Sequence, residues 1–136
     1  MADLTRSQVI YLIAVNTGKG IVLRGVDLSS VDLRNLDLSD ANLVVANLDY
    51  ADLSEATLHG ANLRETSLVG ADLRAADLTD ADLRQADLRS ANLRGAVLIR
   101  ANLWQAKLKD ANLLYANIEG AKGLPVDIYE QLKEKP

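Results

Sequence analysis

The chain has 136 residues and a formal net charge of −4 at pH 7, with 49% hydrophobic and 25% charged residues. These values are typical of one globular domain and exclude a disordered chain or a membrane bundle. The absence of cysteine and the single histidine exclude disulfide frameworks, thiolate nucleophiles and cysteine- or histidine-rich metal sites. The acidic balance also argues against nucleic-acid or anionic-membrane partners.

The first predicted element is a helix within an N-terminal cap, residues 1–20. Thr5-Arg6-Ser7-Gln8 match a capping box, Val9, Leu12 and Ile13 follow at helical spacing, and Gly18 can end the helix.

A β-strand is the alternative for Val9–Val15, which is rich in β-branched residues. That apolar run is too short to span a bilayer, and the segment before it has no basic leader region. We therefore expect a cytoplasmic protein with no membrane segment.

An internal repeat occupies residues 21–120, which divide into 20 pentads without an insertion. The central position, called i, is leucine from Leu23 to Leu113 and isoleucine at Ile118. Alanine occupies i−2 in 15 of the 20 pentads, and Asp or Asn occupies i−1 in 15 of them. The consensus is A-[D/N]-L-x-x.

A period of five fits neither regular element. On a helix, successive leucines would be rotated by about 140° and would spiral around every side. On one continuous strand, they would alternate between opposite faces. The leucines all point inward only if the chain turns a corner in each pentad, so the repeat predicts a solenoid.

The first four pentads carry bulky residues at i−2, namely Ile21, Val26, Val31 and Leu36, whereas alanine begins at Ala41. This change indicates four pentads to a coil, with the terminal coil packed against another element.

The pattern resembles the pentapeptide-repeat family. The resemblance implies an all-β solenoid, a right-handed quadrilateral parallel β-helix with four pentads to a coil. Positions i and i−2 would point inward, and i−1, i+1 and i+2 outward. Twenty pentads would then form about five coils, roughly 24 Å long, between short capping helices at both termini. Small leucine-centred members of this kind are typical of cyanobacteria.

The last predicted element is a C-terminal capping helix within residues 121–136. Gly123-Leu124-Pro125 marks its start, and Leu124, Ile128 and Leu132 lie in one i, i+4 line.

One column of outward residues superficially resembles a catalytic triad. Ser39, His59 and Thr79 stack at i+1, with Asp37 and Asp77 beside them at i−1. Catalysis would need an oxyanion hole and a pocket that excludes water, and a convex solenoid face supplies neither. We predict a noncatalytic protein.

A second column contains three aspartates, Asp32, Asp52 and Asp72. Stacked carboxylates are possible ligands for calcium ions. Arginines lie two residues along, at Arg34 and Arg74, and aspartates at turns accept local backbone hydrogen bonds. These roles are favoured, so we predict no metal and no cofactor.

Six outward residues are candidates for an interaction surface. Val44, Val45 and Val69 are apolar and lie away from both caps. Asp32 and Asp52 belong to an acidic stretch, because residues 21–60 hold seven acids against two arginines, a net charge of −5. Trp104 is the sixth.

Trp104 lies near the C-terminal cap, together with Ile99, Leu114 and Tyr115. For these four, packing under the C-terminal helix is favoured over a partner surface. Residues 61–120 hold eight acids and eight bases, so their net charge is zero.

The favoured function is a noncatalytic scaffold that binds an unidentified protein partner. The resemblance also implies an alternative, DNA mimicry toward a type II topoisomerase such as gyrase. This chain departs from those members in its modest charge, its recurrent arginines and its lack of phenylalanine. We expect no direct nucleic-acid binding, no membrane binding, and a monomer or weak dimer.

Overall fold

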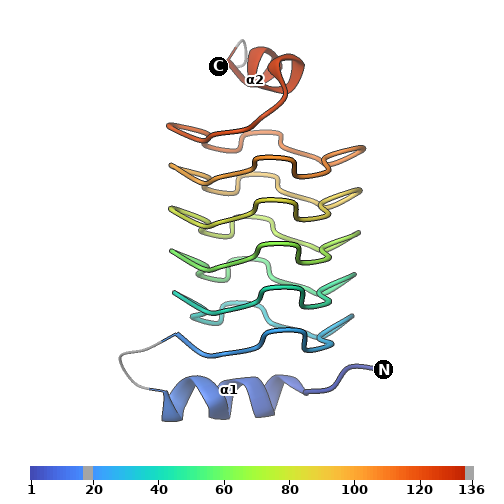
Figure 1. Ribbon diagram of the computed structural model, residues 1–136, viewed down its shortest axis with the longest axis vertical. Coiled ribbons are helices and arrows are strands. Elements are labelled where there is room, and N and C mark those ends of the chain that lie inside the picture. The colour runs from blue at the N-terminus through green and yellow to red at the C-terminus, as the bar shows by residue number, and fades with distance from the viewer. Residues whose placement is uncertain (17–19, 134–136) are drawn as a thin grey trace.

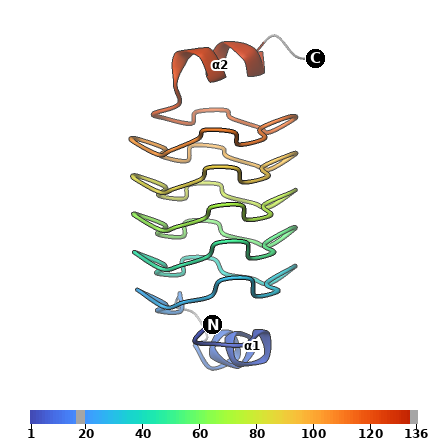
Figure 2. The ribbon, with the colours of Figure 1, turned by 90° about the vertical axis from the view of Figure 1, so that its right-hand side faces the viewer.

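The computed structural model describes residues 1–16 and 20–133 and has the shape of a rod. Helix α1 (Arg6–Val15) lies across one end, a stack of similar turns forms the body, and helix α2 (Val126–Lys133) covers part of the other end (Figure 1). The perpendicular view shows the same stacking from the side (Figure 2). The two helices therefore lie at opposite ends of the rod.

The body is held together by contacts between residues twenty positions apart. Parallel bridges join the i−1 residues of successive turns, from Val22–Asn42 to Asn102–Lys122. Each is isolated, so the expected short strands are reduced, across the described residues, to single bridge positions. The chain turns a corner every five residues, which leaves no room for a longer ladder.

Each corner has one hydrogen bond and one left-handed residue. In the first pentad, the Val26 N–H donates to the Leu23 carbonyl at 3.2 Å. The residue at i+2 has a positive φ in every pentad, from 54° at Val45 to 70° at Gly25, which fits a type II turn. Glycine fills only five of these positions.

The core is aliphatic, and the predicted inward positions are confirmed. Every central leucine from Leu23 to Leu113 is buried, as are the i−2 alanines from Ala41 to Ala101. Thr66 is the buried polar exception, and its hydroxyl donates to the Leu43 carbonyl at 2.7 Å.

The predicted capping box and helix are confirmed at the N-terminus. The Gln8 N–H donates to the Thr5 hydroxyl at 3.3 Å, and the Thr5 N–H donates to the Gln8 side chain at 2.8 Å. Val9 is fully buried against the first turn of the body. The helix ends at Val15, and Gly18 lies outside the described residues.

Three hydrogen bonds fasten the N-terminal segment to the first turn. The Asp3 N–H donates to the Asp27 carbonyl at 2.6 Å, and the Asp27 N–H donates to the Asp3 carboxylate at 2.8 Å. The Arg6 guanidinium donates to the Asp32 carbonyl at 3.1 Å. These contacts satisfy backbone groups at an otherwise open edge.

At the other end, Leu124, Ile128 and Leu132 pack against the core, as their spacing predicts. A cavity of about 190 Å³ is lined by Leu113 and Leu114 of the body and by Ile128 and Leu132 of α2. In the described part of the chain, neither helix is long and apolar enough to cross a bilayer.

Candidate interaction surface

The outward Asp and Asn side chains at i−1 accept backbone hydrogen bonds at the corners. In all 15 pentads that carry one, the side-chain oxygen accepts a hydrogen bond from the N–H of residue i+1, at 2.9 to 3.2 Å. This is the Asx turn, which stabilises a corner locally. The predicted role of these aspartates is confirmed.

Several of these aspartates also pair with an arginine two residues along. Arg84 donates to both oxygens of Asp82, at 2.8 and 2.6 Å, and Arg74 and Arg89 bind Asp72 and Asp87 similarly. Hydrogen bonds from the arginine are the main reason that the pKa of each of the three carboxyls lies below its usual value. The negative charge of these three aspartates is thus balanced by an arginine of the same pentad.

The column that resembled a triad does not bring its members together. The Ser39 hydroxyl donates to Asp37 at 2.6 Å. The His59 Nε2 instead lies 3.6 Å from a carboxylate oxygen of Asp80, which also binds Arg100 at 2.7 Å. Both His59 and Asp80 are on the exposed surface.

In the acidic column of Asp32, Asp52 and Asp72, each carboxylate is near an arginine, and Arg34 pairs with both Asp32 and Asp52, at 2.9 and 3.7 Å. Asp32 binds Arg34 at 2.9 Å and Arg6 at 3.2 Å, and Asp52 accepts the Ser54 hydroxyl at 2.6 Å. Within residues 1–16 and 20–133, no group of three or more acidic or histidine side chains is arranged to hold a metal ion.

The six candidate interaction residues fall on different sides of the rod. Val44, Val45 and Trp104 share one corner, because their pentads are separated by multiples of twenty residues. Val69 lies at the next corner, and Asp32 and Asp52 lie half a turn away.

Exposure separates these residues further. Val44 is only 8% exposed, whereas Trp104 is 59% exposed. Val45 is exposed and adopts the left-handed conformation, which is unusual for a β-branched residue.

The corner shared by Val44 and Trp104 also contains three arginines that are not among the six candidate residues, namely Arg24, Arg64 and Arg84. We call Arg24, Val44, Arg64, Arg84 and Trp104, all at i+1, the Trp104 column. The buried Nε of Arg64 has no hydrogen-bond partner among the described atoms. The twenty-residue spacing is the signal that could have identified this column.

Beside the column, Gln85 donates to Gln105 across one turn at 3.1 Å. This contact links the residues that follow Arg84 and Trp104 in the chain.

Packing under the C-terminal helix, which the sequence favours for Ile99, Trp104, Leu114 and Tyr115, is wrong for two of these four residues. Trp104 and Tyr115 are both exposed, whereas Leu114 is half-buried beside α2. Residues 111–114 line a cavity together with Ile128, Gln131 and Leu132 of helix α2. Tyr115 instead stacks with the guanidinium of Arg94, which is 5.4 Å from the ring centre.

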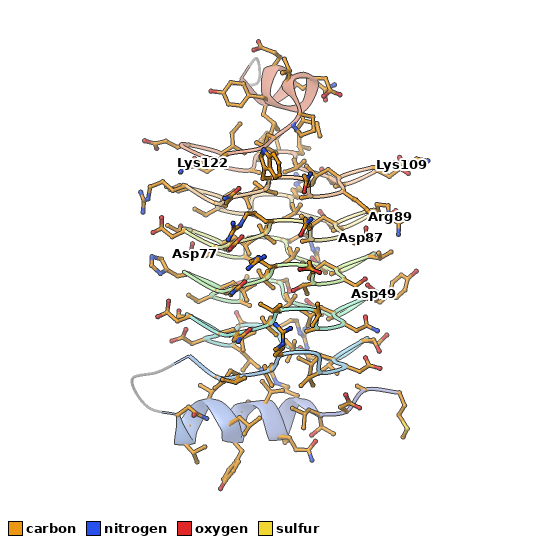
Figure 3. The ribbon with its side chains drawn as sticks, in the orientation of Figure 1. Asp49, Asp77, Asp87, Arg89, Lys109 and Lys122 are labelled. Atoms are coloured by element: carbon orange, nitrogen blue, oxygen red, sulfur yellow. The ribbon has the colours of Figure 1, made fainter. Side chains whose placement is uncertain are left out.

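Charge changes along the rod axis. In one column, Asp49 lies toward the α1 end and Arg89 and Lys109 lie toward the α2 end, along the right-hand edge of Figure 3. Lys122 lies on the other side near α2, above Asp77. The α1 end is therefore acidic along its sides, and basic side chains appear toward α2.

Comparison with known proteins identifies the family to which this repeat belongs. The model of the family described as pentapeptide repeats matches residues 21–60, 57–95 and 86–122, in eight copies. The chain belongs to the pentapeptide-repeat family. Members of this family are generally noncatalytic repeat proteins, and the fold is a right-handed quadrilateral β-helix.

Solved pentapeptide-repeat structures are similar to the chain. Rfr23 from the cyanobacterium Cyanothece 51142 is 29% identical with a TM-score of 0.68, and the match covers 82% of this chain and 95% of Rfr23. A protein of the Arabidopsis thaliana thylakoid lumen is 32% identical, with a TM-score of 0.43 and coverages of 88% and 77%. No curated protein matches.

Proposed function

We propose that this pentapeptide-repeat protein is a noncatalytic scaffold that binds a protein partner through the Trp104 column. The observation that carries the proposal is the exposure of Trp104 in line with Arg84 and Arg64, on a rigid stack of turns. Tryptophan and arginine are the residues most often responsible for binding energy in protein interfaces. A well-packed solenoid presents them in a fixed arrangement at low entropic cost.

The column also indicates the chemistry of the partner. Arg84 is bound to Asp82, whereas the guanidinium of Arg64 has no carboxylate within salt-bridge distance among the described residues. A partner that offers an apolar pocket to Trp104 and a carboxylate to Arg64 would match both side chains. The sequence favours a cytoplasmic location for this binding.

The test is capture of partners from lysate of the native cell by the intact rod. We expect Trp104→Ala to reduce capture by about 30-fold or more, the effect of losing one strong binding residue. The matched control is Tyr115→Ala, which removes an exposed aromatic residue from the opposite corner. A second variant, Val45→Glu, tests whether the surface extends along the column to Val44, because Val45 is the exposed residue next to it. Equal capture by wild type and Trp104→Ala would contradict the proposal.

The alternative is DNA mimicry toward gyrase, and the net charge of −5 in residues 21–60 favours it. Duplex DNA carries one charge per about 1.7 Å, so a mimic roughly 24 Å long would need on the order of 14 charges. The Asp–Arg pairs at Asp32, Asp72, Asp82 and Asp87 weigh against such a surface.

A supercoiling assay distinguishes the two functions. We expect no inhibition of gyrase at stoichiometric levels of protein. Salt-sensitive inhibition that is relieved by neutralising Asp32, Asp37 and Asp52 would favour the alternative.

A further inference from the structure

Helix α1 is apolar on the side that faces away from the rod. Its inward side holds Val9, which is fully buried, but Ile10, Tyr11 and Val15 are 43%, 67% and 54% exposed. A helix that only capped the solenoid would be expected to carry polar residues on its outer side. The run Val9–Val15 instead contains no polar residue except the tyrosine.

The outer side of α1 also carries no charge. Arg6 is the only charged residue in the helix, and it turns toward the rod to bind Asp32. A two-fold interface brings the same patch of both copies together, so a face that carries charge of one sign would repel itself. The uncharged side of α1 is free of this penalty.

We infer that the outer side of α1 is the interface with a second copy of this chain, in which the two α1 helices pack antiparallel about a two-fold axis. We call Ser7, Ile10, Tyr11, Ala14 and Val15 the α1 outer face. Ser7, Tyr11 and Ala14 follow one another at spacings of four and three, which is the spacing of a helix–helix seam. The small residues Ser7 and Ala14 allow the two backbones to approach closely.

The α1 outer face has a hollow at one end and an exposed valine at the other. An apolar hollow of about 350 Å³ lies at the N-terminal half of the helix, lined by Leu4, Ser7, Gln8, Tyr11 and Leu12. Val15 projects at the C-terminal half. An antiparallel arrangement places Val15 of each copy at the hollow of the other, which is the reciprocal contact that a two-fold axis requires.

The exposed apolar area sets the strength of the association. The α1 outer face offers on the order of several hundred Å², comparable with the largest apolar patches of monomers and below the roughly 800 Å² per partner of a standard interface. The dimer is therefore weak. The acidic sides of the two rods would be separated by two helices, each about 10 Å thick, more than the Debye length of about 8 Å at physiological salt.

The first test is the mass of the intact chain as a function of concentration, measured by analytical ultracentrifugation. We expect the mass to rise from 14.7 kDa toward twice that value, with no weakening at higher salt. Val15→Glu should weaken the association by about tenfold or more, because two carboxylates would be buried on an apolar face. Val126→Glu changes an exposed valine on α2 and should leave it unchanged.

The second test uses the absence of native cysteine. Tyr11→Cys should form a disulfide-linked dimer on mild oxidation much faster than Tyr50→Cys, which replaces a tyrosine of the same 67% exposure on the side of the rod. Equal rates, a mass of one chain at every concentration, or a dimer that is lost in Val126→Glu would overturn the inference. Sedimentation of a monomer with phosphatidylcholine–phosphatidylglycerol vesicles, abolished by Val15→Glu, would also overturn it, because the face would then bind lipid.

Discussion

Asp49 accepts the backbone hydrogen bond that the Ser67 side chain does not accept at its own corner. Ser67 stands at an i−1 position where most pentads have Asp or Asn. The Val69 N–H, which would otherwise donate within its own pentad, donates to Asp49 Oδ1 at 2.9 Å across one turn of the solenoid. The Ser67 hydroxyl donates to the same oxygen.

Removal of this acceptor should destabilise the rod locally. We expect Asp49→Ala to lower the free energy of unfolding by about 1–2 kcal/mol, because two donors lose a charged acceptor. Ser67→Asp in the Asp49→Ala background should restore most of the loss by forming the usual Asx turn. Denaturant melts measure both changes, with Glu119→Ala as the control at another i+1 position. If Ser67→Asp does not restore the free energy of unfolding lost in Asp49→Ala, this explanation is contradicted.

Val45 should be strained by its left-handed backbone. A β-branched residue at φ 54° is disfavoured, whereas asparagine tolerates this region. We expect Val45→Asn to raise stability by about 1 kcal/mol. Gly25→Val makes the opposite kind of change, because it introduces valine at a left-handed position. An added Cβ there would meet no atom within 4 Å, so the loss of stability measures the backbone strain alone. Thermal melts in which neither variant differs from wild type would exclude this strain.

The interior should reject added volume at the alanine positions. Ala71 is buried between successive leucines, and Ala71→Leu should cost about 1–3 kcal/mol through overpacking. Ala75→Leu makes the same change at an exposed position of the same pentad and should be nearly neutral. Equal melting temperatures for the two variants would show that the core is looser than the structure indicates.

Acid should destabilise the rod through its Asp–Arg pairs. The pKa of Asp82 is lowered chiefly by the hydrogen bonds from Arg84. The unfolded carboxyl titrates near its usual pKa of about 3.9, so the stabilisation is complete above that pH and is lost as the pH falls through the lower folded pKa. We expect the melting temperature to be level from pH 7 to about 5 and to fall below about pH 4.

Two arginine variants test this origin of the acid sensitivity. Arg84→Gln should make the fall in melting temperature below pH 4 less steep, because one of the Asp–Arg pairs is lost. Arg94→Gln should leave it unchanged, because the residue two positions before Arg94 is Asn92, which does not titrate. Identical acid slopes in both variants would assign the sensitivity to other carboxyls.

Helix α2 should prevent self-association at the C-terminal end. Ile128 packs against the last turns of the body, so Ile128→Asp should detach α2 and expose Leu113 and its neighbours. We expect light scattering to detect aggregation of this variant. Val126→Asp alters the exposed side of the same helix and should scatter like wild type. Lack of aggregation in Ile128→Asp would remove the protective role of α2.

Local rules were sufficient for much of this molecule. The period of five determined which residues point inward, because only a corner in every pentad keeps Leu73 and its equivalents on one side. The capping box at Thr5 and the apolar line through Ile128 likewise depend on residues within four positions of each other. Such contacts can be predicted from spacing alone.

The tertiary structure decided what depends on contacts between turns. Asp49 accepts a hydrogen bond from the corner of Ser67 because the two residues lie on successive turns. Arg6 binds Asp32 because helix α1 packs on the end of the stack. The exposure of Trp104 and of the α1 outer face depends on where each cap lies on the end of the stack. These features arise from side-chain reach across about twenty residues of sequence, a separation at which local spacing has no influence on which atoms meet.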